Sequence, residues 1–256
     1  MNNDLKVMLM AEKITNKIIE SNKEIGKKID KTLQEEGIMG LKKYGISEDV
    51  LKGIKENVSK KEKGKITSSL LVAVVNRNVN LVEELIRNGA DVNTRTTTYY
   101  TALHIAALNG PIRSVKLLVE NGAVVNAGDK DGKTPLHEAA GNSNTEIAKF
   151  LIENGANVDA RTNLGYTALH FAASRFVPET ARIIIEKGAY IDARDNRGET
   201  AMHIAVKNGN IKMIELLIEK GASTSTKDAF GRTPLDFAEG YGRIENLLKG
   251  ERENKK

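Results

Sequence analysis

The chain has 256 residues, of which 29% are charged, with a formal net charge of +5 and neither Cys nor Trp. The missing cysteine excludes disulfides, thiolate catalysis and cysteine-ligated zinc. The basic excess lies at the two ends, because residues 66–248 hold 20 basic and 21 acidic side chains, so no cluster of cations predicts a nucleic-acid partner.

No stretch is long and apolar enough to form an integral membrane segment. The apolar run from Val7 to Ala11 is too short for the core of a signal peptide. We therefore expect a soluble monomer that is cytoplasmic or is delivered by a route that needs no signal peptide.

Residues 1–62 are predicted to form an N-terminal helical region, with a long amphipathic helix over residues 4–36 and a short helix from Ser47 to about Val58. One stripe of the long helix collects the apolar residues Val7, Met10, Ala11, Ile14, Ile18, Ile25 and Ile29. This stripe suits packing on another helix of the protein, or docking on a partner helix or a membrane surface. The mixture of Lys and Glu on the polar face favours the first use.

A fixed period governs the rest of the chain. The four histidines of the protein follow one another at a step of 33 residues: His104, His137, His170 and His203. The same step separates the threonines Thr101, Thr134, Thr167, Thr200 and Thr233. A period in the range of about 20 to 50 residues indicates stacked structural repeats.

The pattern inside the period is Asp-x-x-Gly-x-Thr-Pro-Leu-His-x-Ala-Ala, then an aliphatic run and Gly-Ala, and residues 129–161 carry it most fully. It resembles the ankyrin repeat over residues 66–249. The resemblance implies an all-α solenoid of helix pairs with hairpin-like fingers, and a role in binding other proteins. With the N-terminal helical region, this is the fold class that we expect.

The period also sets the predicted boundaries. Residues 63–95 form an N-terminal capping repeat, residues 96–227 four full repeats, residues 228–249 a shortened closing repeat and residues 250–256 a charged tail. In the closing repeat Asp236 replaces the histidine, and the second helix is expected to contract to about Arg243–Leu248.

The histidines are predicted to be structural. Stacked helices lie about 8–10 Å apart, so histidines of adjacent repeats cannot share a zinc ion whose ligand bonds are about 2 Å long. Each imidazole is expected to bridge its own threonine and the backbone of the adjacent finger, in the pairs Thr101 and His104, Thr134 and His137, Thr167 and His170, and Thr200 and His203. No nucleophile motif or phosphate-binding loop occurs. We therefore expect no enzyme, no metal and no cofactor.

Residues that differ between repeats are not required for packing, and in proteins similar to ankyrin such residues contact partners. One fingertip position holds Thr98, Asp131, Leu164, Arg197 and Phe230, and the position two residues later holds Tyr100, Lys133, Tyr166, Glu199 and Arg232. The first helices add Leu108, Asn109, Asn142, Ser174, Arg175 and Lys207. We expect these residues to bind an unidentified protein partner, with Tyr100, Tyr166, Arg175 and Phe230 as the strongest candidates.

The finger at residues 94–100 departs from the pattern, because Tyr99 stands where the other fingers have glycine. A residue other than glycine disfavours positive φ, so a different turn is expected there, with Tyr99 as part of the binding surface. Asn93 lies in a context that resembles the one modified by ankyrin hydroxylases of animal cells. The preferred interpretation is that Asn93 forms hydrogen bonds within its own hairpin.

Two functions are compatible with these patterns. The first is a non-catalytic protein-interaction module that binds through its fingertips and the concave face of its first helices. The alternative is an effector whose repeats only target an N-terminal helical region that acts on a partner helix or a membrane surface.

Overall fold

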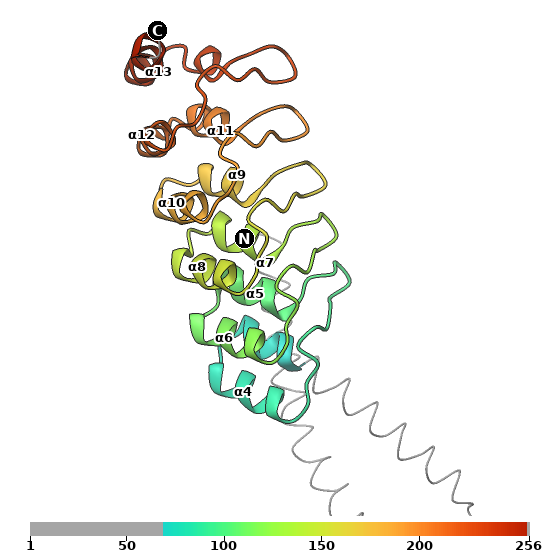
Figure 1. The fold of residues 1–256 in the computed structure, drawn as a ribbon. Coiled ribbons are helices and arrows are strands. Elements are labelled where there is room, and N and C mark those ends of the chain that lie inside the picture. The colour runs from blue at the N-terminus through green and yellow to red at the C-terminus, as the bar shows by residue number, and fades with distance from the viewer. Residues whose placement is uncertain (1–68, 255–256) are drawn as a thin grey trace, which may run out of the picture.

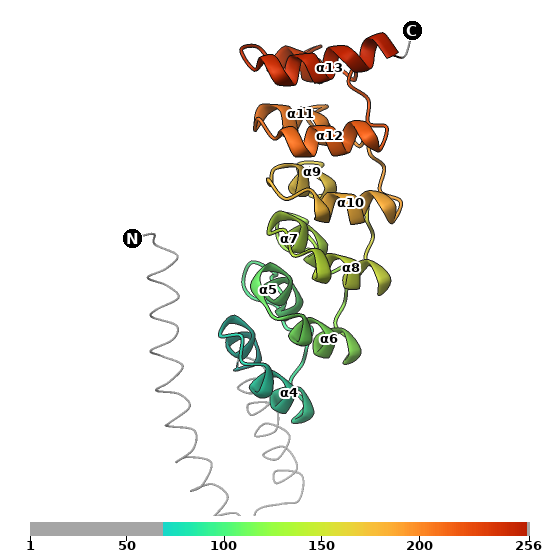
Figure 2. The ribbon, with the colours of Figure 1, turned by 90° about the vertical axis from the view of Figure 1, so that its left-hand side faces the viewer.

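The computed structural model describes residues 69–254, which form helix pairs stacked in chain order with fingers projecting from one side of the stack (Figure 1). The first helix of each pair lies between the fingers and the second helix. A second view shows the same pairs as two adjacent rows of helices (Figure 2). The predicted all-α solenoid is therefore confirmed for the described residues.

The helical elements alternate between the two rows. After a helical stretch over residues 69–75, the first helices are α5 (Ala102–Asn109), α7 (Pro135–Gly141), α9 (Ala168–Ala173), α11 (Ala201–Lys207) and the short 3₁₀ helix η1 (Pro234–Phe237). The second helices are α4 (Val79–Arg87), α6 (Ile112–Glu120), α8 (Thr145–Glu153), α10 (Glu179–Glu186), α12 (Ile211–Glu219) and α13 (Gly242–Asn254). The fingers precede the first helices and span residues 94–100, 127–133, 160–166, 193–199 and 226–232.

Local sequence explains where the first helices begin. Each starts after a threonine in an extended conformation, whose side chain accepts from the backbone at the third helical position, while the histidine there accepts from the threonine amide. This reciprocal arrangement is a capping box, and it satisfies amides that no helical carbonyl can reach. Pro135 occupies the first position of α7, where a missing amide hydrogen is not needed.

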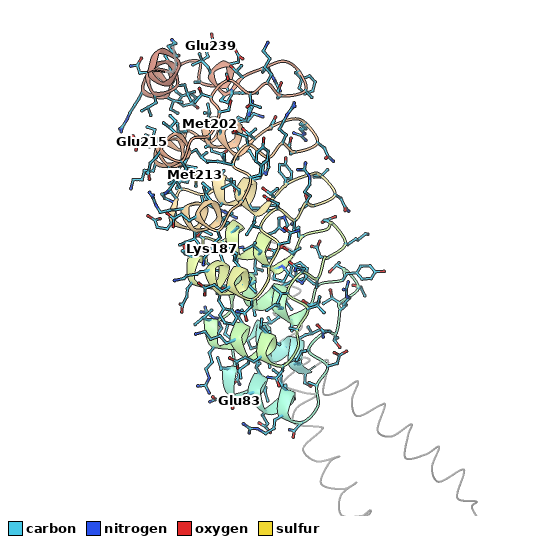
Figure 3. All side chains as sticks on the ribbon, in the orientation of Figure 1. Glu83, Lys187, Met202, Met213, Glu215 and Glu239 are labelled. Atoms are coloured by element: carbon cyan, nitrogen blue, oxygen red, sulfur yellow. The ribbon has the colours of Figure 1, made fainter. Side chains whose placement is uncertain are left out.

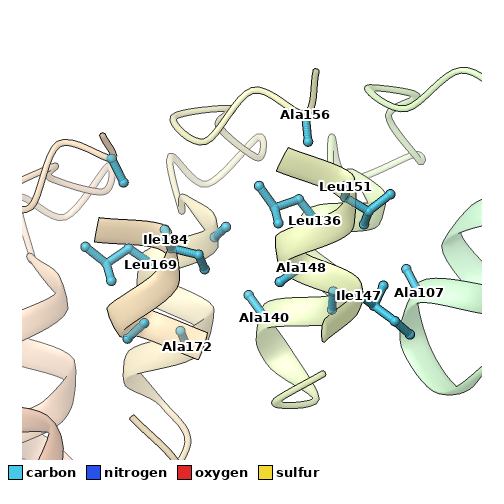
Figure 4. Close-up of a cluster of buried hydrophobic side chains, with 14 of the residues drawn as sticks. Ala107, Leu136, Ala140, Ile147, Ala148, Leu151, Ala156, Leu169, Ala172 and Ile184 are labelled. Carbon is cyan, nitrogen blue, oxygen red and sulfur yellow. The ribbon is translucent and has the colours of Figure 1, made fainter. Parts of the chain in front are cut away.

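The hydrophobic core runs along the stack between the two rows of helices. The first helices contribute Leu103, Leu136, Leu169 and Met202, and the second helices contribute Leu118, Leu151, Ile184 and Leu217, all with exposed fractions of 0–1%. Alanines such as Ala140, Ala148 and Ala172 fill the contacts between these side chains (Figure 4). Their small size lets neighbouring helices approach closely. Each pair covers the apolar face of the next, so stability arises mainly between repeats.

The outer side of the second helices is charged and carries ion pairs between neighbouring repeats. Glu83, Lys187 and Glu215 lie on this side (Figure 3), and Glu215 pairs with Arg243 of the next second helix at 3.1 Å. Because these side chains are exposed, each pair contributes at most about 1 kcal/mol.

The closing repeat differs from the expectation. Its first helix contracts to η1, whereas its second helix, α13, extends over 13 residues. The predicted contraction of the second helix is therefore wrong. Asp236 accepts from the amide and hydroxyl of Thr233 as the histidines do. Its carboxylate, however, has no equivalent of the histidine Nε2–H group that could donate to a following finger. The residues after Leu248 lack the Gly-Ala pair that ends the earlier second helices, so α13 continues.

Several predictions fall on residues that the structure does not describe. They concern the helical region at residues 1–62, its alternative function, the start of the capping repeat and the end of the charged tail. Within residues 69–254, no helix is sufficiently long and apolar to span a bilayer.

Candidate partner-binding surface

The five fingertips are joined to one another by backbone hydrogen bonds. In each case the carbonyl of one tip residue accepts from an amide of the next finger: Thr98 from Lys130 at 3.0 Å, Asp131 from Asn163 at 2.8 Å, Leu164 from Asn196 at 3.0 Å and Arg197 from Ala229 at 2.8 Å. These bonds hold successive fingers at a fixed separation. The tip side chains therefore form an ordered row rather than five independent loops.

Inside each of the last two fingers an aspartate fixes the turn. One carboxylate oxygen of Asp228 accepts from the amides of Phe230 and Arg232 at 2.8 and 2.9 Å, and Asp195 binds its own finger in the same way. Burial alone would raise the pKa of Asp228, but hydrogen bonds from the Arg232 and Phe230 amides and from the Arg232 guanidinium lower it to about 2. The finger therefore keeps its ionised acceptor at neutral pH.

The expectation that residues 94–100 form a different turn is wrong. Tyr99 adopts a φ of +62°, in the left-handed region that glycine occupies in the other fingers. Its amide donates to the Thr96 carbonyl at 2.9 Å, and the Thr96 amide donates to the Tyr100 carbonyl at 2.8 Å. The Thr96 hydroxyl also accepts from the Tyr100 amide, as aspartate does elsewhere. These three bonds offset a left-handed penalty of about 1–2 kcal/mol.

We expect that replacing Gly198 by Ala destabilises the protein more than replacing Gly231 by Ala. Both glycines have positive φ, +74° and +79°, so both substitutions cost about 1–2 kcal/mol in backbone strain. A Cβ on Gly198 would also lie 2.8 Å from the Ala229 nitrogen, whereas a Cβ on Gly231 meets nothing within 4 Å. Overpacking should add about 1–3 kcal/mol at Gly198. Urea unfolding of both variants measures the difference, and equal losses would contradict the packing of one finger on the next.

Each histidine joins two repeats through both of its ring nitrogens. The Nδ1 atom accepts from the amide of the capping threonine at 3.0–3.2 Å. The Nε2 atom lies 2.9–3.2 Å from the carbonyl of Lys133, Tyr166, Glu199 or Arg232 in the next finger. Because the first partner can only donate and the second can only accept, the imidazole must be neutral with its proton on Nε2.

Burial of the rings supports the same protonation state. It lowers the pKa of all four histidines, and for His137 the value falls to about 4. With both nitrogens already engaged, these side chains have structural partners at either end. Among residues 69–254 no three His, Asp or Glu side chains gather where they could hold a metal ion.

The predicted partner-binding residues differ in exposure. The exposed ones are Thr98, Tyr99, Asn109, Asp131, Asn142, Leu164, Ser174, Arg175, Arg197, Lys207, Phe230 and Arg232. The half-buried ones are Tyr100, Leu108, Lys133 and Tyr166. Glu199 is buried, with an exposed fraction of 5%.

Side chains at the position two residues beyond the tip therefore contribute to packing, contrary to the sequence interpretation. The ring of Tyr100 lies 4.8 Å from that of His104, and the carboxylate of Glu199 pairs with Lys207 on α11. Tyr100 and Glu199 therefore brace their fingers against the first helix that follows each of them. The tip position itself is the one whose side chains project into solvent.

Some aromatic residues at or near the surface were not predicted from the sequence. Phe176 and Tyr190 are 68% and 65% exposed, and Phe237 on η1 contacts two cations of the neighbouring elements. Phe176 could have been found, because it stands where other repeats have Gly110, Ser143 and Gly209. The contact of Phe237 with Lys207 depends on the stacking of two repeats, which no single period reveals.

The backbone amide of Asn93 donates to Asp91 within its own hairpin at 2.9 Å, but its side chain binds the following repeat. Its side-chain amide donates to the Gly122 carbonyl at 2.9 Å, and its oxygen accepts from the Val124 amide at 2.8 Å. The preferred interpretation of the sequence is corrected in this respect. The asparagine serves as a clamp between repeats.

Stacked helix pairs, capped fingers and a core shared between neighbours define an α-solenoid repeat protein. A family model described as ankyrin repeats (3 copies) matches residues 70–162, 125–195 and 169–255. The chain therefore belongs to the ankyrin repeat family, whose repeats are protein-interaction modules and are generally non-catalytic. A search of curated proteins found no match to this chain.

Proposed function

We propose that the protein is a non-catalytic binding module that holds one protein partner along the fingertips and the adjoining exposed face of the first helices. The observation that carries this proposal is the combination of a fixed backbone with unlike tip side chains. Thr98, Asp131, Leu164, Arg197 and Phe230 occupy one position on successive fingers that are joined through their backbones.

The tips expose large apolar groups that contribute nothing to the core. Leu164 is 63% exposed and Phe230 is 74% exposed. Burying such side chains against a partner would stabilise a complex by about 25 cal/mol for each Å² of apolar area. Because the fingers are already ordered, little conformational entropy is lost on docking.

The proposal is tested by replacing both Leu164 and Phe230 with Ser. Affinity capture from extracts of the cells that make the protein, quantified by mass spectrometry, should show the captured partner reduced at least about ten-fold. The matched control is the pair Val124→Ser and Tyr190→Ser, which are 51% and 65% exposed but lie outside the fingers. Capture that is insensitive to the fingertip pair, or that the control pair abolishes instead, would rule out this surface.

A further inference from the structure

Opposite charges are separated by burial in the last three fingers, residues 160–166, 193–199 and 226–232. Their five cations, Arg161, Arg194, Arg197, Lys227 and Arg232, are all exposed. Their three carboxylates, Asp195, Glu199 and Asp228, have exposed fractions of only 5%, 5% and 4%. Although the sequence of these fingers contains both signs of charge, the surface they present to solvent is cationic.

The buried carboxylates have partners within the fold. Asp195 accepts from two amides of its own finger, and Glu199 pairs with Lys207. Arg194 reaches the Lys227 carbonyl of the next finger at 2.9 Å, which is a neutral acceptor. For Arg197 at the central tip, no ion pair occurs among the described residues. Its charge is therefore available to a partner.

Arg232 is held in place beside these fingertips. Its guanidinium carbon lies 4.8 Å from the centre of the Phe230 ring and 4.5 Å from that of Phe237. Its Nε and Nη2 atoms both lie 2.8 Å from one oxygen of Asp228. A guanidinium has five donor hydrogens, so several remain for an incoming acceptor. The Arg232 side chain is 44% exposed, and its fixed orientation suits the planar geometry of a carboxylate.

The last three tip residues alternate in chemistry along the row. Leu164 is apolar, Arg197 is cationic and Phe230 is apolar, and the backbone bonds between their fingers fix this order. Adjacent repeats are spaced by roughly 10 Å, so the two apolar tips are separated by roughly 20 Å. An extended chain advances about 3.3 Å per residue, which makes this distance about six residues.

We propose that these three fingers bind an acidic protein segment whose carboxylates contact Arg197 and Arg232 and whose flanking apolar side chains contact Leu164 and Phe230. This inference rests on the proposed function and adds the chemistry of the partner. A nucleic acid would also supply negative charge, but it would leave Leu164 without an apolar contact. The alternation of charge and apolar surface therefore favours a protein segment.

Selection from a displayed library of random peptides of about twelve residues, long enough to cross all three fingers when extended, tests the proposal on the full chain. We expect the selected pool to be enriched at least about two-fold in Asp and Glu, with apolar residues about six positions apart. Binding of that pool, measured by biolayer interferometry, should fall at least about ten-fold for Arg197→Glu. The control is Lys149→Glu, the same change of charge at an exposed site on α8, which should leave binding unchanged.

The outcomes separate the two proposals. A pool of neutral or basic peptides that binds through Phe230 would overturn the acidic partner while leaving the fingertip surface in place. If binding of the pool were unchanged by every fingertip substitution, both proposals would be overturned. Binding of single-stranded oligothymidylate tighter than that of the peptide pool, and sensitive to Arg197→Glu, would assign the cationic row to nucleic acid instead.

Discussion

Acidification from about pH 7 to about pH 5 is expected to lower the unfolding free energy by about 2 kcal/mol through His137 alone. In the folded protein burial depresses the pKa of His137 to about 4, against an ordinary value of 6.5. Between these values the unfolded chain binds a proton that the folded protein does not, so stability rises with pH across this window. The stabilisation is present above about pH 6.5 and is lost as the pH falls towards 4.

The other three histidines act in the same direction, because burial lowers their pKa values as well. Protonation of any of these rings would place a hydrogen on Nδ1 against the threonine amide that now donates to it. Urea unfolding followed by circular dichroism at several pH values measures the combined loss.

Replacement of His137 by Gln provides the control for this mechanism. The variant should be less stable at neutral pH, because one bridge between repeats is lost. Its stability should nevertheless change less between pH 7 and pH 5, by about the 2 kcal/mol assigned to that residue. If the variant kept the full pH dependence of the parent, the proton uptake assigned to His137 would have to come from other groups.

The substitution Leu151→Ala is expected to destabilise the protein by about 2–5 kcal/mol, whereas Leu164→Ala should change stability by no more than about 0.5 kcal/mol. Leu151 on α8 is 0% exposed, and Leu164 at a fingertip is 63% exposed. The first change leaves a cavity where two repeats meet. The second removes methyl groups that already contact water.

The effect of the same two substitutions on binding should be reversed. If Leu164 contacts the partner, Leu164→Ala weakens capture although the protein remains as stable as before. Leu151→Ala should leave capture per folded molecule unchanged at a temperature where the variant is still folded. Thermal unfolding and interferometry on both variants measure the two effects, and a stability loss at Leu164 equal to that at Leu151 would contradict the division between core and surface.

The repeat architecture was predictable because the same residue pattern recurs several times in the sequence. One histidine 33 residues from the next says little, but four of them with matching threonines indicate one structural unit in register. The capping boxes follow from residues three positions apart on the same helix, which is a local relationship. Local relationships that recur are the ones a sequence reveals most reliably.

These errors concern contacts that form only in the folded protein, within a finger, between a finger and its own helix, or between repeats. The left-handed conformation of Tyr99 was unexpected, because the three hydrogen bonds around Thr96 that offset its strain form only in the folded finger. The burial of Glu199 was missed, because its position varies between repeats and variation alone does not reveal the ion pair with Lys207. The side-chain bonds of Asn93 were not foreseen, because their partners, Gly122 and Val124, belong to the next repeat.

The sequence by itself determined the fold family, the order of the helices and the residues that cap them, since period and capping depend on neighbours along the chain. Only the tertiary structure decided which charges face solvent. In the last three fingers aspartate and glutamate turn inward because backbone amides and Lys207 bind them there, while Arg197 remains outside. Burial depends on how the folded fingers bind their own side chains, so counting five cations against three carboxylates understates the positive charge that these fingers expose.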